Sequence, residues 1–208
     1  MEIKRLPLGF FSVNCYILNL GSDCIIIDPG ADAEEIKNYI SQKALNPLLV
    51  LNTHGHYDHI GAVPEMLRTY NISLYIHPLE EEIITDPGRN MSQAFGDNSF
   101  SISKYTLIDD RTRPFLEGLG LQIIHTPGHT PGSICIRKDG NLFCGDLLFA
   151  QAAGRTDLPG GKVAQIKDSL NKIRKMDKNL ILYPGHGPET TIEAELAANY
   201  YLSDDFLG

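Results

Sequence analysis

The sequence is short of basic residues and of long apolar runs, and each shortage excludes a class of protein. Lys and Arg total 18 against 26 Asp and Glu, which gives a formal net charge of -8. Nucleic-acid binders present a basic surface that displaces counterions from phosphate, so we expect no nucleic-acid partner. The longest apolar runs fall below the roughly 18 residues that a membrane-spanning helix requires, so we expect no membrane partner either.

The four cysteines lack the CxxC spacing that is typical of structural zinc sites. Cys15, Cys24, Cys135 and Cys144 each lie in an apolar, strand-like run. Cysteines in such runs are usually buried free thiols, with disulfides or metal ligation as the alternative. Free thiols persist in reducing compartments, which predicts a cytoplasmic protein.

Length and composition are those of an ordinary globular protein. The chain has 208 residues, of which 42% are hydrophobic and 21% charged. No internal repeat or low-complexity linker divides it, so we predict a single domain over residues 1–208.

The periodicity of the apolar residues predicts an alternation of strands and helices. We expect strands at 2–6, 11–20, 23–28, 47–52, 73–76, 105–109, 119–125, 133–137, 141–145 and 179–183, and helices at 33–45, 61–70, 79–85, 162–177 and 189–201. Residues 86–104 are polar and turn-rich, and they are predicted to form a surface loop. Each half begins with strands and continues with mixed strands and helices. This order predicts an α/β fold, a four-layer αββα sandwich of two mixed sheets with helices outside.

Residues 53–62 read THGHYDHIGA and crowd three of the seven histidines beside an aspartate. Residues two apart point the same way only in an extended chain, so His54 and His56 can bind one ion if this segment is strand-like or looped. Asp58 and His59 lie where the chain turns into the next predicted helix. Their side chains should therefore diverge from the first pair, toward a second ion.

Two ligands do not complete a catalytic zinc site, which usually has three protein ligands and an open position. Three further donors follow predicted strands: His129 in TPGHTPGS, Asp146 in FCGDLLF and His186 in YPGHGP. Glycine and proline around each donor predict tight loops that hold the side chain in a cleft. The sequence therefore offers four ligand-bearing loops.

Taken together and in this order, these four segments resemble the metallo-β-lactamase superfamily. Within it the chain is most similar to the glyoxalase II-like (hydroxyacylglutathione hydrolase-like) hydrolases, from about residue 25 to the final helix. The resemblance implies the metallo-β-lactamase fold and two metal sites that share one carboxylate. The implied ligands are His54, His56 and His129 for the first ion, Asp58, His59 and His186 for the second, and Asp146 between them.

The implied cofactors are two divalent metal ions, zinc first, with iron or manganese as alternatives. Metals about 3.5–4 Å apart can share a water and lower its pKa, so that a bridging hydroxide forms near neutral pH. Asp58 and Asp146 are the expected catalytic carboxylates. A thiol has a pKa of about 8.5 and leaves as thiolate with little help from an acid, which favours a thioester or a related small ester as the small-molecule substrate.

Other reaction classes remain as alternatives. A persulfide dioxygenase would use one iron held by His54, His129 and Asp146, a facial triad with open positions for oxygen. The hydrolase-like context of His186, YPGHGPETT, favours the hydrolase. A non-catalytic metal protein is disfavoured because both sites look complete, a nuclease because basic surface is missing, and a β-lactam hydrolase because such enzymes usually replace the bridging aspartate by cysteine.

Several polar residues outside the ligand set have two interpretations each. Arg155 in GRTDLPGG either holds a substrate carboxylate or pairs with Asp157 to order its loop. His77 and His125 are predicted to pack or to form hydrogen bonds behind the ligands. Asp28 in IDPG is predicted to form a turn and not to bind metal, with support of the metal ligands from behind as a further possible role. No motif in the sequence indicates the oligomeric state or the physiological substrate.

Overall fold

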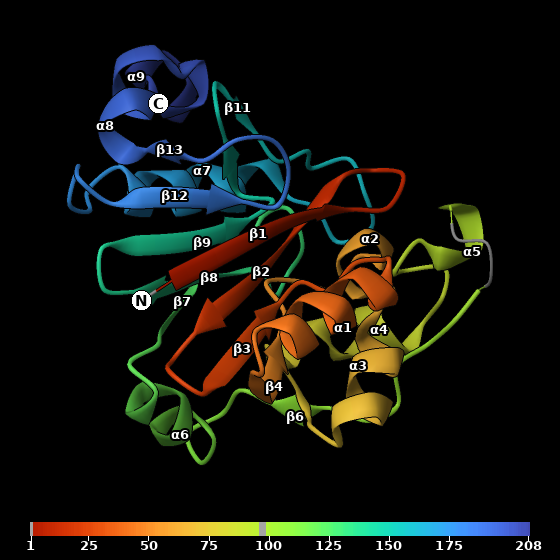
Figure 1. Cartoon of the computed structure of the whole chain (residues 1–208). Coiled ribbons are helices and arrows are strands. Elements are labelled where there is room, and N and C mark those ends of the chain that lie inside the picture. Colours follow the sequence, from red (N-terminus) through yellow and green to blue (C-terminus); the bar gives the residue numbers. More distant parts are fainter. Residues whose placement is uncertain (1, 96–98) are drawn as a thin grey trace. The chain divides into compact units, whose positions relative to one another are not determined.

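The computed structural model describes residues 2–95 and 99–208 and divides the chain into two compact units. Unit 1 ends at Ile108 and unit 2 begins at Asp109. Each unit carries its own sheet and its own helices (Figure 1). The single domain over residues 1–208 stays a prediction.

Unit 1 is built on a mixed sheet whose strands follow one another in sequence order. Its strands are β1 (Glu2–Leu8), β2 (Val13–Asn19), β3 (Asp23–Ile27), β4 (Asn46–Leu51), β5 (Leu74–Ile76) and β6 (Thr106–Leu107). The first three are antiparallel neighbours, and β3 to β6 are parallel. Parallel strands end at the same edge of a sheet, so the loops after β3 and β4 begin side by side.

The helical elements of unit 1 are α1 (Ala33–Gln42), α2 (Tyr57–Ile60), α3 (Val63–Tyr70), the 3-10 turn η1 (Pro78–Glu80), α4 (Glu81–Thr85) and α5 (Ser92–Phe95). Helices α1 and α3 bury an apolar face against the sheet. Ile36 and Ile40 lie four apart on α1, and they share one buried cluster with Met66 of α3 and with Ile26 and Val50 of the strands. Two helices thus cover one face of the sheet.

Unit 2 contains a second mixed sheet, in the order β13-β12-β9-β8-β7. These strands are β7 (Gln122–His125), β8 (Ile134–Lys138), β9 (Asn141–Gly145), β12 (Ile181–Pro184) and β13 (Thr190–Thr191). Among the described strands of this second sheet, only the β9–β12 pair is parallel. Because β7 and β9 are both antiparallel to β8, the strands β7, β9 and β12 all run in one direction.

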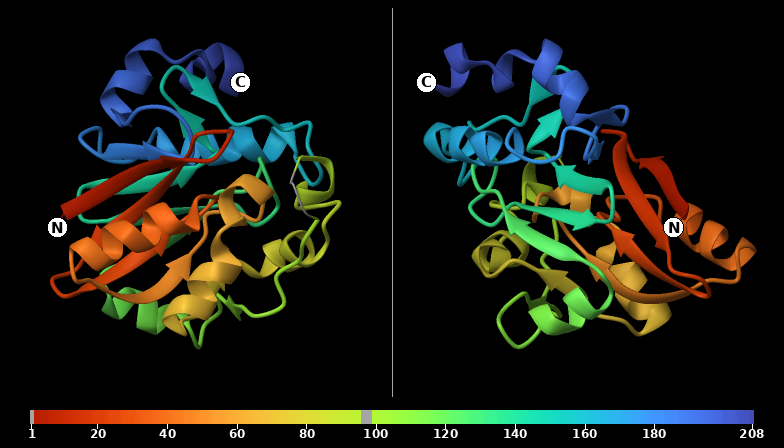
Figure 2. Two further views of the ribbon diagram at one scale, coloured as in Figure 1. Left: turned by 45° about the vertical axis from the view of Figure 1, so that its right-hand side comes forward. Right: turned by 90° about the vertical axis from the view of Figure 1, so that its left-hand side faces the viewer.

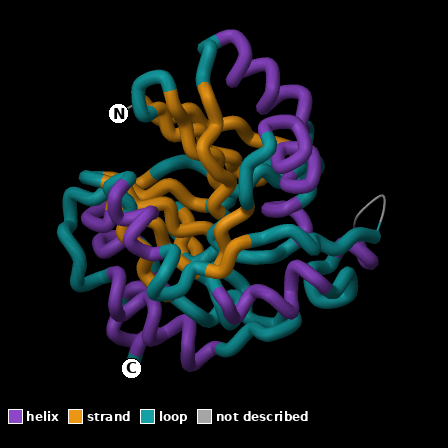
Figure 3. Tube along the Cα trace, turned by 90° about the horizontal axis from the view of Figure 1, so that it is seen from below, coloured by secondary structure: helices purple, strands orange, loops and turns teal. Residues whose placement is uncertain are grey.

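The helices of unit 2 can be followed in two further views (Figure 2). They are α6 (Arg113–Gly118), α7 (Val163–Ile173), α8 (Ile192–Ala198), the 3-10 turn η2 (Tyr200–Leu202) and α9 (Asp204–Leu207). All of them except α6 contribute to one buried cluster with the sheet of this unit. Ile166 and Leu170 of α7 join Leu142 and Leu182 of the strands in one buried cluster. Figure 3 colours the helices, the strands and the loops that join them.

The structure corrects the predicted elements in several places. The helix expected at 61–70 is α3, which begins at Val63, and Pro64 falls in its first turn, where a missing N–H costs little. The short helix α2 comes before it and was not predicted. The predicted loop 86–104 contains α5, and its residues 96–98 lie outside the described residues. Helix α6 and the small hairpin of β10 (Leu148–Phe149) and β11 (Ala152–Ala153) were not predicted, because elements this short carry too few apolar residues to show a period.

Two expectations drawn from composition can be compared with the described residues. In ranges 2–95 and 99–208, no helix is long and apolar enough to span a membrane.

All four cysteines are buried and free, which confirms the prediction of free thiols. Burial raises the pKa of Cys24 and of Cys135 to about 12, so both stay protonated at neutral pH. The cytoplasmic location stays a prediction.

Candidate metal centre

The buried carboxylate of Asp28 contacts the ligand loop of unit 1 at two residues, Thr53 and His59. Asp28 follows β3 and the loop follows β4, so the topology places them together. The Asp28 Oδ1 accepts a hydrogen bond from the Thr53 backbone N–H (2.7 Å), and its Oδ2 accepts from the Thr53 hydroxyl (2.6 Å). The same Oδ2 lies 3.0 Å from His59 Nδ1. Asp28 has a φ of 50°, in agreement with the predicted turn, and its contacts with Thr53 and His59 match the possible supporting role.

These contacts set the tautomers of two candidate ligands. The carboxylate of Asp28 only accepts, so His59 carries its proton on Nδ1. The Thr53 hydroxyl gives its proton to Asp28, so its oxygen accepts from His54 Nδ1 at 3.1 Å. In both histidines the lone pair is therefore on Nε2, the form that binds a metal ion.

The three histidines of the ligand loop form a tight buried cluster. The ring centroids of His54 and His56 are 4.9 Å apart, and those of His54 and His59 are 4.1 Å apart. All three side chains are buried. The Asp58 Oδ2 lies 4.0 Å from His59 Nε2. Unit 1 thus brings together all four of its predicted ligands, and the two predicted pairs lie beside each other.

Close backbone packing holds this loop in place. The Gly55 N–H donates to the fully buried carboxylate of Glu80 at 2.7 Å, and a Cβ on Gly55 would lie 2.8 Å from the Ile84 side chain. A Cβ on Gly30 would lie 1.6 Å from the Asp58 carbonyl oxygen. Glycine is therefore required at Gly30, where the neighbour is backbone, and a Cβ at Gly55 would force the Ile84 side chain to shift.

Sequence reasoning missed three residues that support the loop. They are Glu80, Thr53 and Asn52. The Asn52 Nδ2 donates to the His59 carbonyl at 2.7 Å. Asn52 and Thr53 directly precede the first ligand, and short polar residues at that place could have been recognised as hydrogen-bonding supports of the loop. Glu80 lies in PLEEEIIT beside similar exposed residues, and nothing in the pattern distinguishes it.

Unit 2 gathers its three predicted ligands at one sheet edge. The strands β7, β9 and β12 run in one direction, and His129, Asp146 and His186 follow their carboxyl ends. The Asp146 Oδ2 lies 3.6 Å from His129 Nε2 and 3.7 Å from His186 Nε2. One carboxylate oxygen thus lies close to ligand atoms from two other loops, as a shared ligand requires.

The loop that follows Asp146 orients His129. The His129 Nδ1 lies 2.8 Å from the carbonyl oxygen of Arg155. A carbonyl only accepts, so Nδ1 carries the proton and Nε2 carries the lone pair. A Cβ on Gly154 would lie 1.7 Å from the Asp146 carbonyl oxygen, which shows how closely this loop packs. Every residue type has a backbone carbonyl, so the sequence could not reveal this contact.

The Arg155 side chain pairs with Asp157. Its Nε and one terminal nitrogen each lie 2.7 Å from a carboxylate oxygen of Asp157, a bidentate pair. This guanidinium lowers the pKa of Asp157 to about 2. The pair matches the second of the two roles predicted for Arg155, and contact with substrate stays a prediction.

The two remaining histidines have structural roles in their own units. The His77 Nδ1 accepts from the Leu79 N–H at 3.2 Å and caps η1. The His125 Nε2 lies 2.9 Å from the Pro131 carbonyl oxygen. The prediction of packing or hydrogen bonding is confirmed for both.

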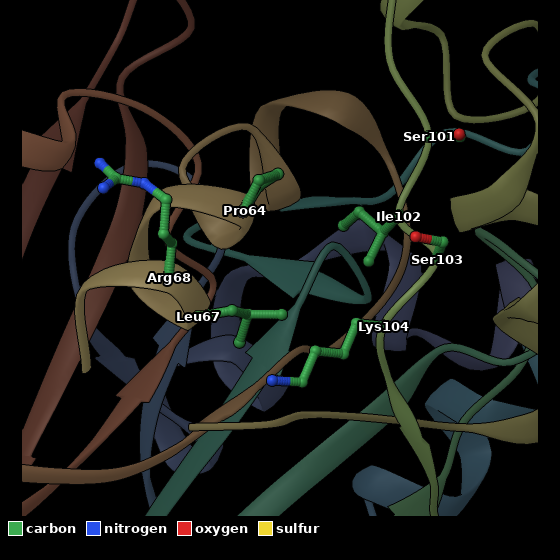
Figure 4. A pocket seen from close by; sticks show the side chains of 7 residues that line it. All are labelled: Pro64, Leu67, Arg68, Ser101, Ile102, Ser103 and Lys104. Carbon is green, nitrogen blue, oxygen red and sulfur yellow. The ribbon is translucent and has the colours of Figure 1, made fainter. Parts of the chain in front are cut away.

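A cavity in unit 1 contains none of the candidate ligands. It encloses about 250 Å³ and is lined by Pro64, Leu67, Arg68, Ser101, Ile102, Ser103 and Lys104 (Figure 4). The Arg68 guanidinium lies 2.6 Å from Glu65 and is directed away from Ile102. The lining thus lacks the imidazole and carboxylate donors that a metal centre requires.

Comparison with known proteins decides the family. Residues 8–186 match the family model of the metallo-beta-lactamase superfamily. The chain belongs to the metallo-β-lactamase superfamily. It is 35% identical to the probable metallo-hydrolase YqgX of Bacillus subtilis, with 98% of each chain covered. It is 30% identical to the hydroxyacylglutathione hydrolase GloC of Haemophilus influenzae, over 98% of this chain and 99% of that one.

Two solved structures share the fold over almost the whole chain. The structure of BLEG-1 B3 metallo-beta-lactamase has a TM-score of 0.88 and 35% identity, and covers 97% of this chain and 100% of that one. The di-iron-bound form of TTHA1623 has a TM-score of 0.86 and 31% identity, with 96% and 100% covered. The predicted metallo-β-lactamase fold with two mixed sheets is confirmed. The chain is a metal-dependent hydrolase of this superfamily with His and Asp residues that bind metal ions.

Proposed function

We propose that this protein is a two-metal hydrolase that cleaves thioesters. In this proposal units 1 and 2 form one domain, and their seven donors hold two divalent ions in the arrangement that the family resemblance implies. His54, His56 and His129 hold one ion, Asp58, His59 and His186 hold the other, and Asp146 is shared. A small-molecule thioester binds beside them.

One observation carries the proposal. In His54, His59 and His129 the Nδ1 atom faces an acceptor of the same unit, namely the Thr53 hydroxyl, the Asp28 carboxylate and the Arg155 carbonyl. Asp28 determines the first two of these contacts, and the Arg155 backbone determines the third. Metal-binding histidines commonly have such a partner on the second nitrogen, which fixes the ring and raises its basicity. The donor set therefore fits divalent metal ions.

The acidic side chains of the site have different roles in the proposed reaction. Bound metal ions supply Lewis-acid polarisation of a carbonyl and activation of water near neutral pH. Asp146 and Asp58 contribute negative charge that holds two cations close together. Asp28 keeps His59 oriented throughout. A departing thiolate needs no proton at neutral pH, so a dedicated acid is unnecessary for a thioester but required for an amide.

Relatives bear on the substrate and on the metal. GloC, by its name, hydrolyses a glutathione thioester, and TTHA1623 has been seen with two irons. We infer a thioester substrate by similarity to the first. Zinc is our first choice for this chain, with iron or manganese as alternatives, and two iron ions are compatible with the same donors.

A second candidate activity is β-lactam hydrolysis, which the name of BLEG-1 raises at 35% identity. An amide nitrogen is a poorer leaving group than a thiolate, which places this activity behind thioester cleavage. The persulfide dioxygenase alternative needs one iron and three donors, and it leaves the Asp28-supported His59 without a use.

A panel of substrates separates these activities. Protein loaded with zinc, iron or manganese is assayed with a lactoyl thioester of glutathione, the matched oxygen ester and amide, a cephalosporin, and glutathione persulfide in an oxygen electrode. We expect kcat/KM for the thioester to reach about 10⁴ M⁻¹ s⁻¹ and to exceed every other value at least about 100-fold. Faster cleavage of the cephalosporin, or oxygen uptake with persulfide, would refute the proposal.

A further inference from the structure

We propose that four aromatic side chains of unit 1 form a binding site for an apolar acyl group of the substrate. This inference rests on the proposed thioester hydrolysis and narrows its substrate class. The side chains are Phe10, Phe11, Tyr57 and Phe95, which we call the aromatic cluster.

The rings of the aromatic cluster are arranged around Phe11. Its centroid lies 5.3 Å from that of Phe10, 6.2 Å from Tyr57 and 6.0 Å from Phe95, with interplanar angles of 87°, 82° and 89°. These are edge-to-face contacts at favourable distances. The rings come from three separate segments, namely the β1–β2 turn, α2 and α5. The fold, and not one local run of sequence, therefore assembles them.

Much of this aromatic surface faces solvent. Phe10 is 93% exposed, Phe95 56% and Phe11 41%. A single exposed apolar residue is common, but several in mutual contact mark a surface that binds something apolar. None of the four side chains carries a charge at neutral pH. The cluster thus suits an uncharged aromatic or branched aliphatic group.

The cluster adjoins the candidate ligands within the same unit. Tyr57 lies between His56 and Asp58 in the chain, and its N–H donates to the Asn90 carbonyl at 2.7 Å. A Cβ on Gly30 would contact both the Asp58 carbonyl and the Val13 side chain, so the start of β2 also lies near the ligand loop. An acyl group held by these rings would lie next to the histidine cluster.

The turn that carries Phe10 and Phe11 is itself held in place. The Gly9 N–H donates to Asp32 at 2.7 Å, and the Ser12 N–H donates to the Gly9 carbonyl at 3.1 Å. Both ends of the turn have positive φ, 66° at Gly9 and 51° at Ser12. A turn fixed in this way can present two aromatic rings to a ligand at a small cost in conformational entropy.

The experiment compares two thioesters of one thiol, phenylacetyl and acetyl. The test protein is the double variant Phe10→Ser/Phe11→Ser, and the control is Phe115→Ser, which removes a 47% exposed ring from α6 in unit 2. We expect the wild-type protein to prefer the phenylacetyl thioester in kcat/KM. In the double variant, the ratio of kcat/KM for the phenylacetyl thioester to kcat/KM for the acetyl thioester should fall about 10-fold, because the loss of such aromatic contacts weakens binding by about that factor. The fall should come from the phenylacetyl thioester alone. The control should keep the preference.

Binding of the free acids separates failure of this inference from failure of the proposed function. Ligand-observed NMR should show phenylacetate binding more tightly than acetate, and the double variant should weaken only the former. If the wild type hydrolyses no thioester but this binding pattern holds, the site stands and the proposed function falls. An unchanged preference together with unchanged phenylacetate binding would overturn the inference. So would a double variant that dissociates a dimer without altering the acyl preference, because the cluster would then be an interface between copies.

Discussion

Replacing Asp146 with asparagine is expected to reduce thioester turnover at least about 10³-fold, because in the proposed two-metal centre this carboxylate supplies charge to both ions. Its Oδ2 lies within 3.7 Å of ligand atoms on both His129 and His186. Asparagine keeps the shape and removes the negative charge. The variant should also bind fewer metal ions per chain, which elemental analysis of the same sample measures.

The matched control is Asp157→Asn in the next loop of unit 2. Asp157 is exposed and pairs with the Arg155 side chain, whereas it is the Arg155 backbone that holds His129. Turnover by this control should stay within about 3-fold of wild type, as is usual for surface changes. Comparable losses in both variants would mean that Asp146 acts only by ordering its loop.

Replacing Asp28 with asparagine is expected to destabilise the metal-free protein by about 3 kcal/mol and to weaken metal binding about 10–100-fold. The carboxylate accepts from the Thr53 N–H, the Thr53 hydroxyl and His59 Nδ1 while nearly fully buried. An asparagine offers one acceptor oxygen and turns an N–H₂ toward the remaining donors. Urea unfolding with chelator present measures the first effect, and competition with a chromophoric chelator measures the second.

Asp32→Asn provides the comparison, since Asp32 is also an aspartate with positive φ in unit 1. Its carboxylate accepts from the Gly9 N–H at an exposed position, and asparagine retains an oxygen for that bond. The change in unfolding free energy should be within about 0.5 kcal/mol. If Asp28→Asn were equally mild and bound metal normally, the proposed control of the His54 and His59 tautomers would be wrong.

The sequence could name the candidate ligands because each is a His or Asp at a glycine-rich strand end, and their binding of metal stays a prediction. The grouping of His129, Asp146 and His186 additionally follows from three strands that run in one direction, which only the pairing of β7, β8, β9 and β12 establishes. Asp28 was recognisable as a turn former because IDPG ends an apolar run. That its strand is parallel to the strand before the ligand loop is established only by the structure.

The supporting contacts were beyond sequence reasoning for physical reasons. The partner of His129 is the backbone carbonyl of Arg155, which every residue type possesses. Glu80 is fully buried while its neighbours Glu81 and Glu82 are exposed, and this depends on how η1 and α4 pack against Gly55. Helix α1 was predicted to reach residue 45 but ends at Gln42, because the Leu45 N–H bonds back to the Ile40 carbonyl and Ala44 takes a φ of 51°.

The most direct test of the central claim is the metal content of protein purified without added metal. Elemental analysis by mass spectrometry, referenced to quantitative amino-acid analysis, should give two transition-metal ions per chain for wild type and for Asp157→Asn. Asp146→Asn should bind fewer. A wild-type chain that binds one iron and cannot take up a second ion, or that binds none, would contradict the two-metal account.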